Sequence, residues 1–425
     1  MRHLFVCAGL APAFICLAQS QDMSGMQMNM PGMKSDPTQA LLMNQASGTA
    51  MNPESFPLPM VMADVDRWKL MFMGQAFLVE TQQSGPRGYD KFYGPNWVMG
   101  MADHKLGVGT LEFQAMISLD PATITERSYP LLFQTGETAF GKPLVDAQHP
   151  HDLFMSIAAQ YALAVTENTI VQIYYAPVGD PALGPVAFPH RLSASELPQA
   201  PIGHHWQDST HIADNVVTFA IKYKIFRLEA SGFYGSEPDE NRWNIDWGPI
   251  NSWSARASVM PNRNWMAQVS VGRLSNPERE SPGDVTRATA SLHYTRPMNG
   301  SGWATSFIWG RNHETVQRRN LNSYLLESVF PASRKNFLTG RAELVDKDEL
   351  FADDVTLEES IAKTSGSTFR IGAYTLGYTR DVGTFHHVEV GIGVNATAYT
   401  LPPAIKPYYG DHPAGVNVFG RFRLR

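Results

Sequence analysis

Cysteine is nearly absent from this sequence. The 425 residues contain two cysteines, Cys7 and Cys16, and both lie within the first 16 residues. This part of the chain has the pattern of a removable leader, so a mature chain would carry no thiol. Disulfides, thiolate metal sites and cysteine nucleophiles are thereby excluded.

Long apolar runs and basic clusters are also missing. After residue 20, no run reaches the 18 or more apolar residues that a membrane helix requires. Charged residues make up 17% of the chain, its formal net charge is −6, and no segment is strongly basic. The sequence therefore excludes a helical membrane protein and argues against a nucleic-acid partner.

Residues 1–20 predict a secretory signal peptide. Arg2 gives a basic start, residues 4–17 are apolar, and the small residues Ala18 and Ser20 precede Gln21. A lipoprotein signal at Cys16 is the alternative, but Phe14 and Ile15 stand where such a signal has small residues. We expect export and removal of this segment.

Two regions follow, with different patterns. Residues 21–62 are rich in Met, Pro and Ser without a sustained apolar period, which predicts a flexible periplasmic tail. From residue 63 to 425 many stretches alternate between apolar and polar residues, as a strand with two different faces does. In one example, Val388, Val390 and Ile392 alternate with Glu389 and Gly391.

The alternating stretches predict about sixteen strands whose connections are short and long in turn. The expected strands are 68–79, 96–104, 109–118, 153–163, 169–176, 216–223, 226–234, 252–260, 265–273, 286–296, 302–311, 321–330, 336–345, 368–381, 388–399 and 415–424. An even number of strands with this loop alternation is typical of an antiparallel transmembrane β-barrel. A soluble all-β sandwich or propeller is the alternative fold.

Over residues 68–425 the chain resembles the outer-membrane β-barrel proteins of Gram-negative cells, including an alternating last strand that contains Phe422. The resemblance implies an outer-membrane location, lipid as a partner and a water-filled lumen. The charged side chains expected to face that lumen are Glu112, Lys222, Arg227, Glu229, Arg256, Arg287, Arg341 and Glu343.

Methionine is concentrated in the first part of the chain. Most of the 19 methionines precede residue 102, and the densest group is Met23, Met26, Met28, Met30 and Met33. Thioethers are soft, neutral ligands that suit Cu(I) or Ag(I). Met71 and Met73 share a strand face with Lys69 and Gln75, which predicts that they face the lumen and add to a thioether track. The alternative is that methionine only fills space.

A signal peptide, a Met-rich tail and a carboxy-terminal barrel together resemble the copper-resistance protein B family. The resemblance implies copper or silver binding, tolerance or export across the outer membrane. Expected partners are the ion itself and periplasmic copper-handling proteins.

Histidines are grouped in the second and third long loops, at His149, His151, His190, His204, His205 and His211. Pro150 favours an extended His149, which predicts that His149 and His151 point to one side with Asp152 adjacent. Imidazole and carboxylate groups suit Cu(II) or Zn(II). The alternative is a polar plug in which these histidines make ordinary hydrogen bonds.

Two further functions are open at this stage. A general porin or small-solute channel would need neither metal site, and like the metal-handling function it involves no catalysis. A barrel-embedded hydrolase would use Ser209 as nucleophile with His205 or His211 as base, although the sequence has no nucleophile-elbow motif.

Overall fold

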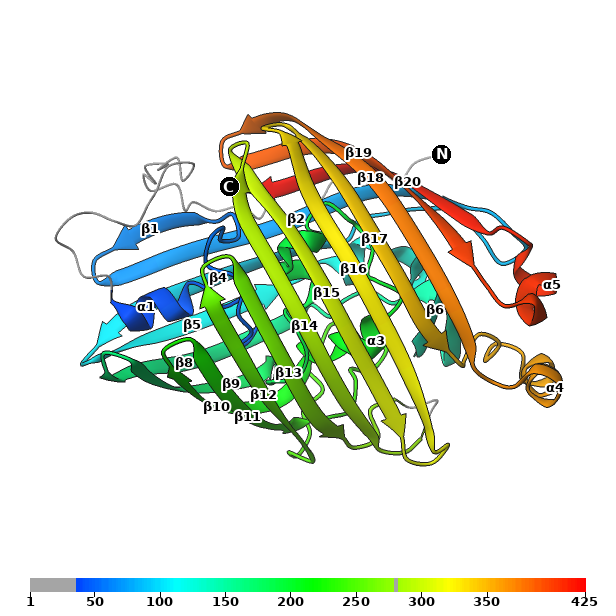
Figure 1. Cartoon of the computed structure of the whole chain (residues 1–425), viewed down its shortest axis with the longest axis horizontal. Coiled ribbons are helices and arrows are strands. Elements are labelled where there is room, and N and C mark those ends of the chain that lie inside the picture. Colours follow the sequence, from blue (N-terminus) through cyan, green and yellow to red (C-terminus); the bar gives the residue numbers. More distant parts are fainter. Residues whose placement is uncertain (1–35, 279–281) are drawn as a thin grey trace, which may run out of the picture.

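The computed structural model describes residues 36–278 and 282–425, and a closed antiparallel β-barrel is its main element (Figure 1). Sixteen strands of the described chain form the ring, and β20 closes it by pairing with β2. The strands are β2 (Trp68–Gln83), β4 (Asn96–Leu106), β5 (Gly109–Ile117), β8 (Phe154–Thr166), β9 (Thr169–Gly179), β10 (Ala213–Tyr223), β11 (Phe226–Tyr234), β12 (Ser252–Asn262), β13 (Trp265–Leu274), β14 (Val285–Met298), β15 (Ser301–Glu314), β16 (Arg319–Ser333), β17 (Asn336–Lys347), β18 (Phe369–Phe385), β19 (Val388–Thr400) and β20 (Ala414–Leu424).

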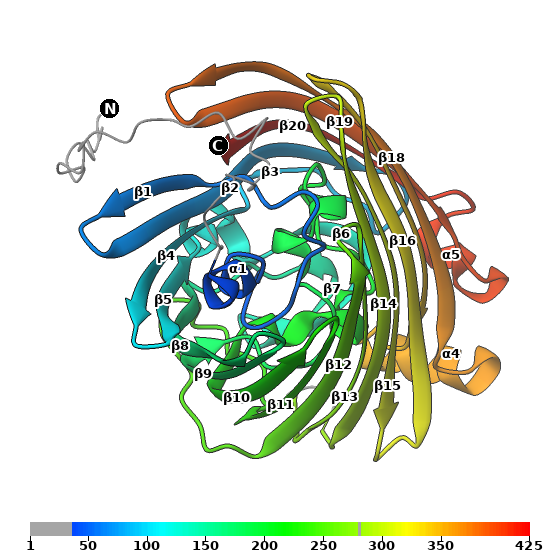
Figure 2. The same cartoon turned by 60° about the vertical axis from the view of Figure 1, so that its left-hand side comes forward.

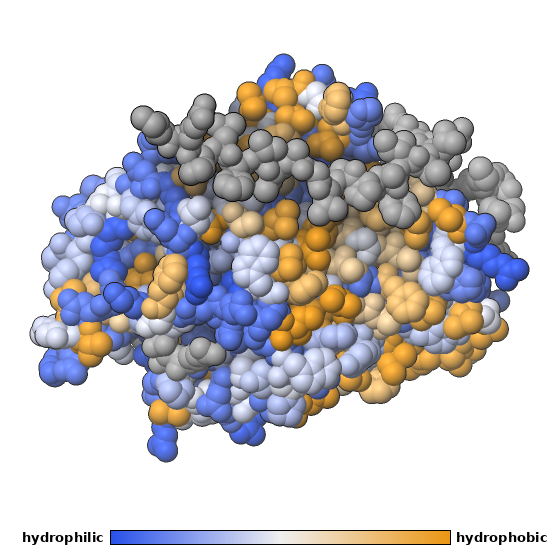
Figure 3. Space-filling model, turned by 180° about the vertical axis from the view of Figure 1, so that it is seen from behind, coloured by the Kyte–Doolittle hydropathy of each residue, from blue (hydrophilic) through white to orange (hydrophobic). Residues whose placement is uncertain are grey.

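Each of these strands coincides with one of the sixteen stretches expected from the sequence, so the all-β barrel is confirmed. The reason is local, because strict alternation gives each strand one apolar and one polar face. In β13, for example, Trp265 and Val269 are exposed on the outside, whereas Gln268 and Ser270 are buried inside. Apolar side chains gather on the outer surface in broad areas (Figure 3).

The connections differ between the two ends of the barrel. Tight turns such as the one between β4 and β5 lie at one end, which we call the short-turn end. The other, long-loop end carries a separate hairpin of β6 (Tyr129–Ala139) and β7 (Lys142–Gln148) and the helices α2 (Asp120–Thr123), α4 (Val355–Ser365) and α5 (Lys406–Tyr409). Short strands β1 (Val61–Val65) and β3 (Lys91–Tyr93) each pair with β2. Across residues 36–278 and 282–425, no helix is long and apolar enough to cross a bilayer.

Chain segments occupy the lumen, contrary to the expectation that it is filled with water. We call residues 180–212, which connect β9 to β10, the plug, and residues 36–60 the inner segment. Figure 2 shows α1 (Pro37–Leu42) of the inner segment inside the ring of strands, together with green coils of the plug. Most plug residues are buried, and the charged wall residues Arg227, Glu229 and Arg256 are buried in ion pairs.

The inner segment corrects the expectation of a flexible tail for residues 36–62. Asp36 caps α1 by accepting a hydrogen bond from the backbone N–H of Thr38 at 2.9 Å. Leu41 and Leu42 then pack in an apolar cluster with Met51, Ala162, Ile170, Met260 and Met266. The sequence pattern missed this fold because these apolar side chains find their partners on the barrel wall and not within the segment itself.

Candidate functional site

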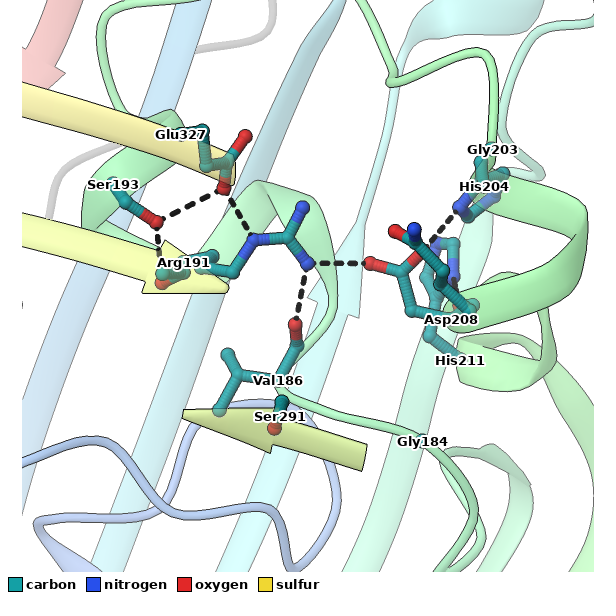
Figure 4. Close-up of polar contacts among 12 residues, drawn as sticks. Gly184, Val186, Arg191, Ser193, Gly203, His204, Asp208, His211, Ser291 and Glu327 are labelled. Carbon is teal, nitrogen blue, oxygen red and sulfur yellow. Dashed lines mark hydrogen bonds and ion pairs between the residues drawn. The ribbon is translucent and has the colours of Figure 1, made fainter. Parts of the chain in front are cut away.

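Buried ion pairs hold the plug against one side of the barrel. Arg191, in the plug, donates from Nε to Glu327 of β16 at 2.5 Å and from Nη1 to Asp208 at 2.8 Å (Figure 4). Arg341 of β17 binds the other oxygen of Glu327 at 2.9 Å. Further along the plug, Glu196 pairs with both Arg421 and Arg423 of β20. The charged side chains of the wall and of the plug therefore neutralise each other without bulk water.

Methionines line the lumen wall on the next strands of the ring, β2, β4, β5 and β8. Met71 and Met73 of β2 lie opposite Met101 and Met99 of β4, and Met99 in turn lies opposite Met116 of β5. Met60 and Met155 join the same buried cluster. Directly opposed side chains have Cβ atoms roughly 5 Å apart, so neighbouring thioethers meet across three strands. We call Met60, Met71, Met73, Met99, Met101, Met116 and Met155 the methionine wall. The expectation that Met71 and Met73 face the lumen agrees with their burial.

A small cavity of about 10 Å³ lies where the methionine wall meets the plug. Its lining includes Met99, Met116, Met155, His190 and His211, and we call it the Met–His cavity. Ser47 of the inner segment lines it as well. Neither ring nitrogen of His190 has a hydrogen-bond partner among the described residues, and Nε2 of His211 has none either. Burial lowers the pKa of His190 to about 4, so its imidazole is neutral and able to bind a metal ion.

The loop histidines lie close together at the long-loop side of this cavity. Ring centroids are 5.6 Å apart for His151 and His211, 5.2 Å for His204 and His211, and 6.0 Å for His149 and His205. His204 and His205 belong to α3 (His204–Gln207). The structure therefore brings together two histidines of the second long loop and three of the plug.

Several of these groups make the ordinary hydrogen bonds of a polar plug. Nδ1 of His151 contacts Asp120 at 2.9 Å, and Nδ1 of His204 contacts Asp208 at 2.7 Å. Asp152 forms an ion pair with Arg242 at 3.3 Å. Burial opposes ionisation of Asp208, but its contacts with His204 and Arg191 outweigh burial and hold its pKa below the usual value.

His149, His151 and Asp152, which the sequence predicts to lie on one side, have different polar partners. Nε2 of His149 lies 2.7 Å from Glu137, whereas His151 turns toward Asp120 and Phe188. The pattern around Pro150 did not reveal this, because the partners come from distant loops.

The hydrolase arrangement is not formed. The hydroxyl of Ser209 accepts a hydrogen bond from Arg287 at 2.9 Å and lies 3.4 Å from Glu237. His211 uses its Nδ1 for the backbone oxygen of Asp208. A nucleophilic serine requires a base within hydrogen-bond reach, and within residues 36–278 and 282–425 Ser209 contacts no imidazole.

Five of the predicted ligands lie outside the described residues, and the sequence did not point to several residues that line the site. Met23, Met26, Met28, Met30 and Met33 precede the described residues. Sequence reasoning missed Met116 and Met155, since both follow the Met-rich first part of the chain, although Met116 stands at an inward position of β5. It also missed the carboxylates Glu137, Glu237 and Glu278, which approach His205 from three loops.

The comparisons with known proteins concern the fold. The sequence matches no protein-family model and no curated protein. The structure is similar to OmpF from Salmonella typhi in complex with daunomycin, with a TM-score of 0.52 and 10% identity over 85% of this chain and 100% of that one. It is also similar to an anion-selective porin from Comamonas acidovorans, with a TM-score of 0.50 and 9% identity over 84% of this chain and 100% of that one.

These likenesses and the closed sheet define the chain as a β-barrel with the porin-like fold of Gram-negative outer-membrane proteins. The resemblance to the copper-resistance protein B family finds no support in the comparisons and stays a prediction.

Proposed function

We propose that this protein is an outer-membrane channel for small solutes whose lumen is closed by its own chain. The apolar outer face, the closed ring and the unequal loop lengths support insertion in an outer membrane, with the long loops outside and the short turns in the periplasm. The observation that carries the closed state is the plug, held by Arg191 between Glu327 and Asp208. Passage then requires the plug or the inner segment to move, which favours selective transport over free diffusion.

Planar-bilayer conductance of the full-length protein tests this function. Gly179 and Ala213 are paired neighbours in β9 and β10, so a short Gly-Ser turn can replace residues 181–211 without opening the sheet. We expect rare openings of the native protein and sustained open-channel current after the replacement. A native protein as conductive as the shortened variant would contradict closure by the plug. A shortened variant without current would contradict a channel.

A soft metal ion, Cu(I) or Ag(I), is the solute that the Met–His cavity favours. Met99, Met116 and Met155 supply thioethers there, and His190 supplies an imidazole with no competing hydrogen bond in the described chain. Uncharged soft ligands select a soft monovalent ion over Ca(II) or Mg(II). Met23, Met26, Met28, Met30 and Met33 would capture the ion ahead of the barrel, in line with a role in copper tolerance.

Substitution of the three cavity methionines by leucine tests the soft-ion function. Leucine conserves side-chain volume and costs less than about 1.5 kcal/mol per site, but it removes the ligand. We expect the triple variant to bind Ag(I) about tenfold more weakly, equal to about 1.4 kcal/mol, by titration in nitrate buffer. The matched control is Met260→Leu with Met266→Leu, since both are buried in the lumen away from the cavity. Equal loss in both variants would reject the site.

The five methionines Met23, Met26, Met28, Met30 and Met33, which we call the Met tract, need a separate variant. Changing all five of its methionines to isoleucine should lower the copper concentration that cells tolerate while leaving the Met–His cavity intact. An unchanged tolerance threshold would remove the tract from the proposed function.

A further inference from the structure

A second group of potential ligands lies at the long-loop end, and it contains no sulfur. Glu137, His149 and His205 each offer one ligand atom, and these atoms lie within 4.8 Å of one another. His205, Glu237 and Glu278 form another such group. His205 belongs to both groups, so β6, the end of β7, α3 and the loops after β11 and β13 converge on one imidazole.

The imidazole of His205 lacks a partner that its burial requires. The residue is 3% exposed, and its Nε2 has no hydrogen-bond partner among the described residues. Its Nδ1 lies 3.8 Å from Glu278. A buried polar atom without a partner costs about 1–3 kcal/mol, and a bound ion would remove that cost. The neighbouring Gly136 has φ +105°, and a Cβ there would lie 2.4 Å from the His205 ring, so the backbone leaves room for the imidazole.

Charged groups of both signs surround His205. One buried carboxylate oxygen of Glu237 has no hydrogen-bond partner in the described chain. Arg242 forms an ion pair with Glu137, and the positive charges of Arg287 and Lys347 act on Glu278. These cations compensate the carboxylates without a hydrogen bond to His205 in the described residues.

A cavity of about 360 Å³ leads to this group. Glu137, Glu237 and Glu278 line it, together with further carboxylates of the loop after β11, among them Glu240 and Asp246. The cavity is large enough for a hydrated ion, and its acidic lining attracts cations. Ligands at its inner end can then replace the water of hydration.

We propose that His149, His205, Glu137, Glu237 and Glu278 form a binding site for a divalent transition-metal ion, with Zn(II) as the first choice and Cu(II) as the second. Two imidazoles and carboxylate oxygens are the ligands that these ions prefer, whereas soft monovalent ions prefer thioethers. The contact of His149 Nδ1 with the backbone oxygen of Pro150 at 2.9 Å leaves Nε2 directed toward Glu137. The site is separate from the Met–His cavity and does not depend on transport through the barrel.

Metal titration of the full-length protein in detergent, after treatment with a chelator, tests this site. Co(II) serves as a coloured substitute for Zn(II), because its visible absorption reports nitrogen ligands. We expect one tight Co(II) site that Zn(II) displaces. His205→Gln removes a ligand and should weaken binding by more than the roughly 10- to 100-fold that loss of a residue supporting a ligand costs, and Glu237→Gln with Glu278→Gln should do the same.

Two controls keep the result decisive. Glu359→Gln removes an exposed carboxylate of α4 at the same end of the barrel that does not line this cavity, and it should leave Co(II) affinity unchanged. Far-ultraviolet circular dichroism and Ag(I) binding should be native in every variant, which separates this site from folding and from the soft-ion function. Absence of Co(II) binding to the native protein, equal binding by His205→Gln, or an equal loss in Glu359→Gln would overturn the proposal.

Discussion

Two segments fill the lumen of this barrel, and they are held there by different forces. The plug is attached to strands at both of its ends, and its buried charges are neutralised by the wall, as in the Arg191–Glu327 pair. The inner segment relies mainly on hydrogen bonds from uncharged side chains, such as those from Gln45 to Gln172 at 2.9 Å and from Ser47 to Asp180 at 2.9 Å, and on the leucines of α1. Its ion pair between Asp36 and Lys105 is partly exposed. Breaking a buried ion pair leaves an uncompensated charge, whereas breaking a neutral bond does not.

This difference predicts that the inner segment leaves the lumen more easily than the plug does. The inner segment can leave the lumen by exchanging its hydrogen bonds for bonds to water. The plug can leave only if several buried charges lose their ion-pair partners. The Met–His cavity lies between the two, with Ser47 from the inner segment and His190 from the plug. Withdrawal of the inner segment would therefore open the cavity while the plug still closes the lumen.

The largest expected effect comes from the charge that holds the plug. Glu327→Gln leaves Arg191 and Arg341 without the carboxylate that they share, at a cost of about 3–5 kcal/mol. We expect frequent channel openings in planar bilayers and a lower midpoint of thermal unfolding.

Glu112→Gln is the matched control for that variant. Glu112 is equally buried, but on the methionine side of the lumen, and it accepts a hydrogen bond from the side-chain amide of Gln160 and not from a cation. Conductance and unfolding midpoint should stay near those of the native protein. Equal changes in both variants would mean that the ionic side does not hold the plug.

An intermediate effect separates two histidines of the plug. His204→Leu removes a charge-assisted contact with Asp208 and should cost about 1.5–3 kcal/mol. His190→Leu removes no hydrogen bond in the described chain, so the unfolding midpoint should stay the same or rise. Thermal unfolding in detergent compares the two. If His190→Leu is as destabilising as His204→Leu, the His190 imidazole has a structural partner and the Met–His cavity loses its free ligand.

The wall of this barrel could be predicted from the sequence far better than its contents. Alternation is a local property, so Val388 to Ile392 alone indicate a strand, and Met71 and Met73 could be assigned to the lumen from their neighbours. The plug depends on contacts between distant residues, such as Arg191 with Glu327, that no local pattern records. The ligands around His205 likewise come from loops far apart in the sequence.

One local signal for the inner segment was present in the sequence. Asp36 followed by Pro37 is a favourable helix start, since aspartate caps the first turn and proline fits its first position. What the pattern lacked was a long apolar period, because a six-residue helix buries only Thr38, Leu41 and Leu42. A short helix inside a lumen is therefore hard to distinguish from a tail on periodicity alone.

The smallest expected effect comes from that cap. Asp36→Ala removes the bonds to Thr38 and the ion pair with Lys105, at a cost of about 1 kcal/mol to α1. The loss should fall on docking of the inner segment alone, because the ring of strands does not depend on it. We expect faster cleavage within residues 36–60 under limited proteolysis, with an unchanged unfolding midpoint and no added conductance, because the plug still closes the lumen. Thr38→Ser is the control, since it keeps a hydroxyl in place. Added conductance in Asp36→Ala would instead make the inner segment part of the closure and remove the distinction between the two segments.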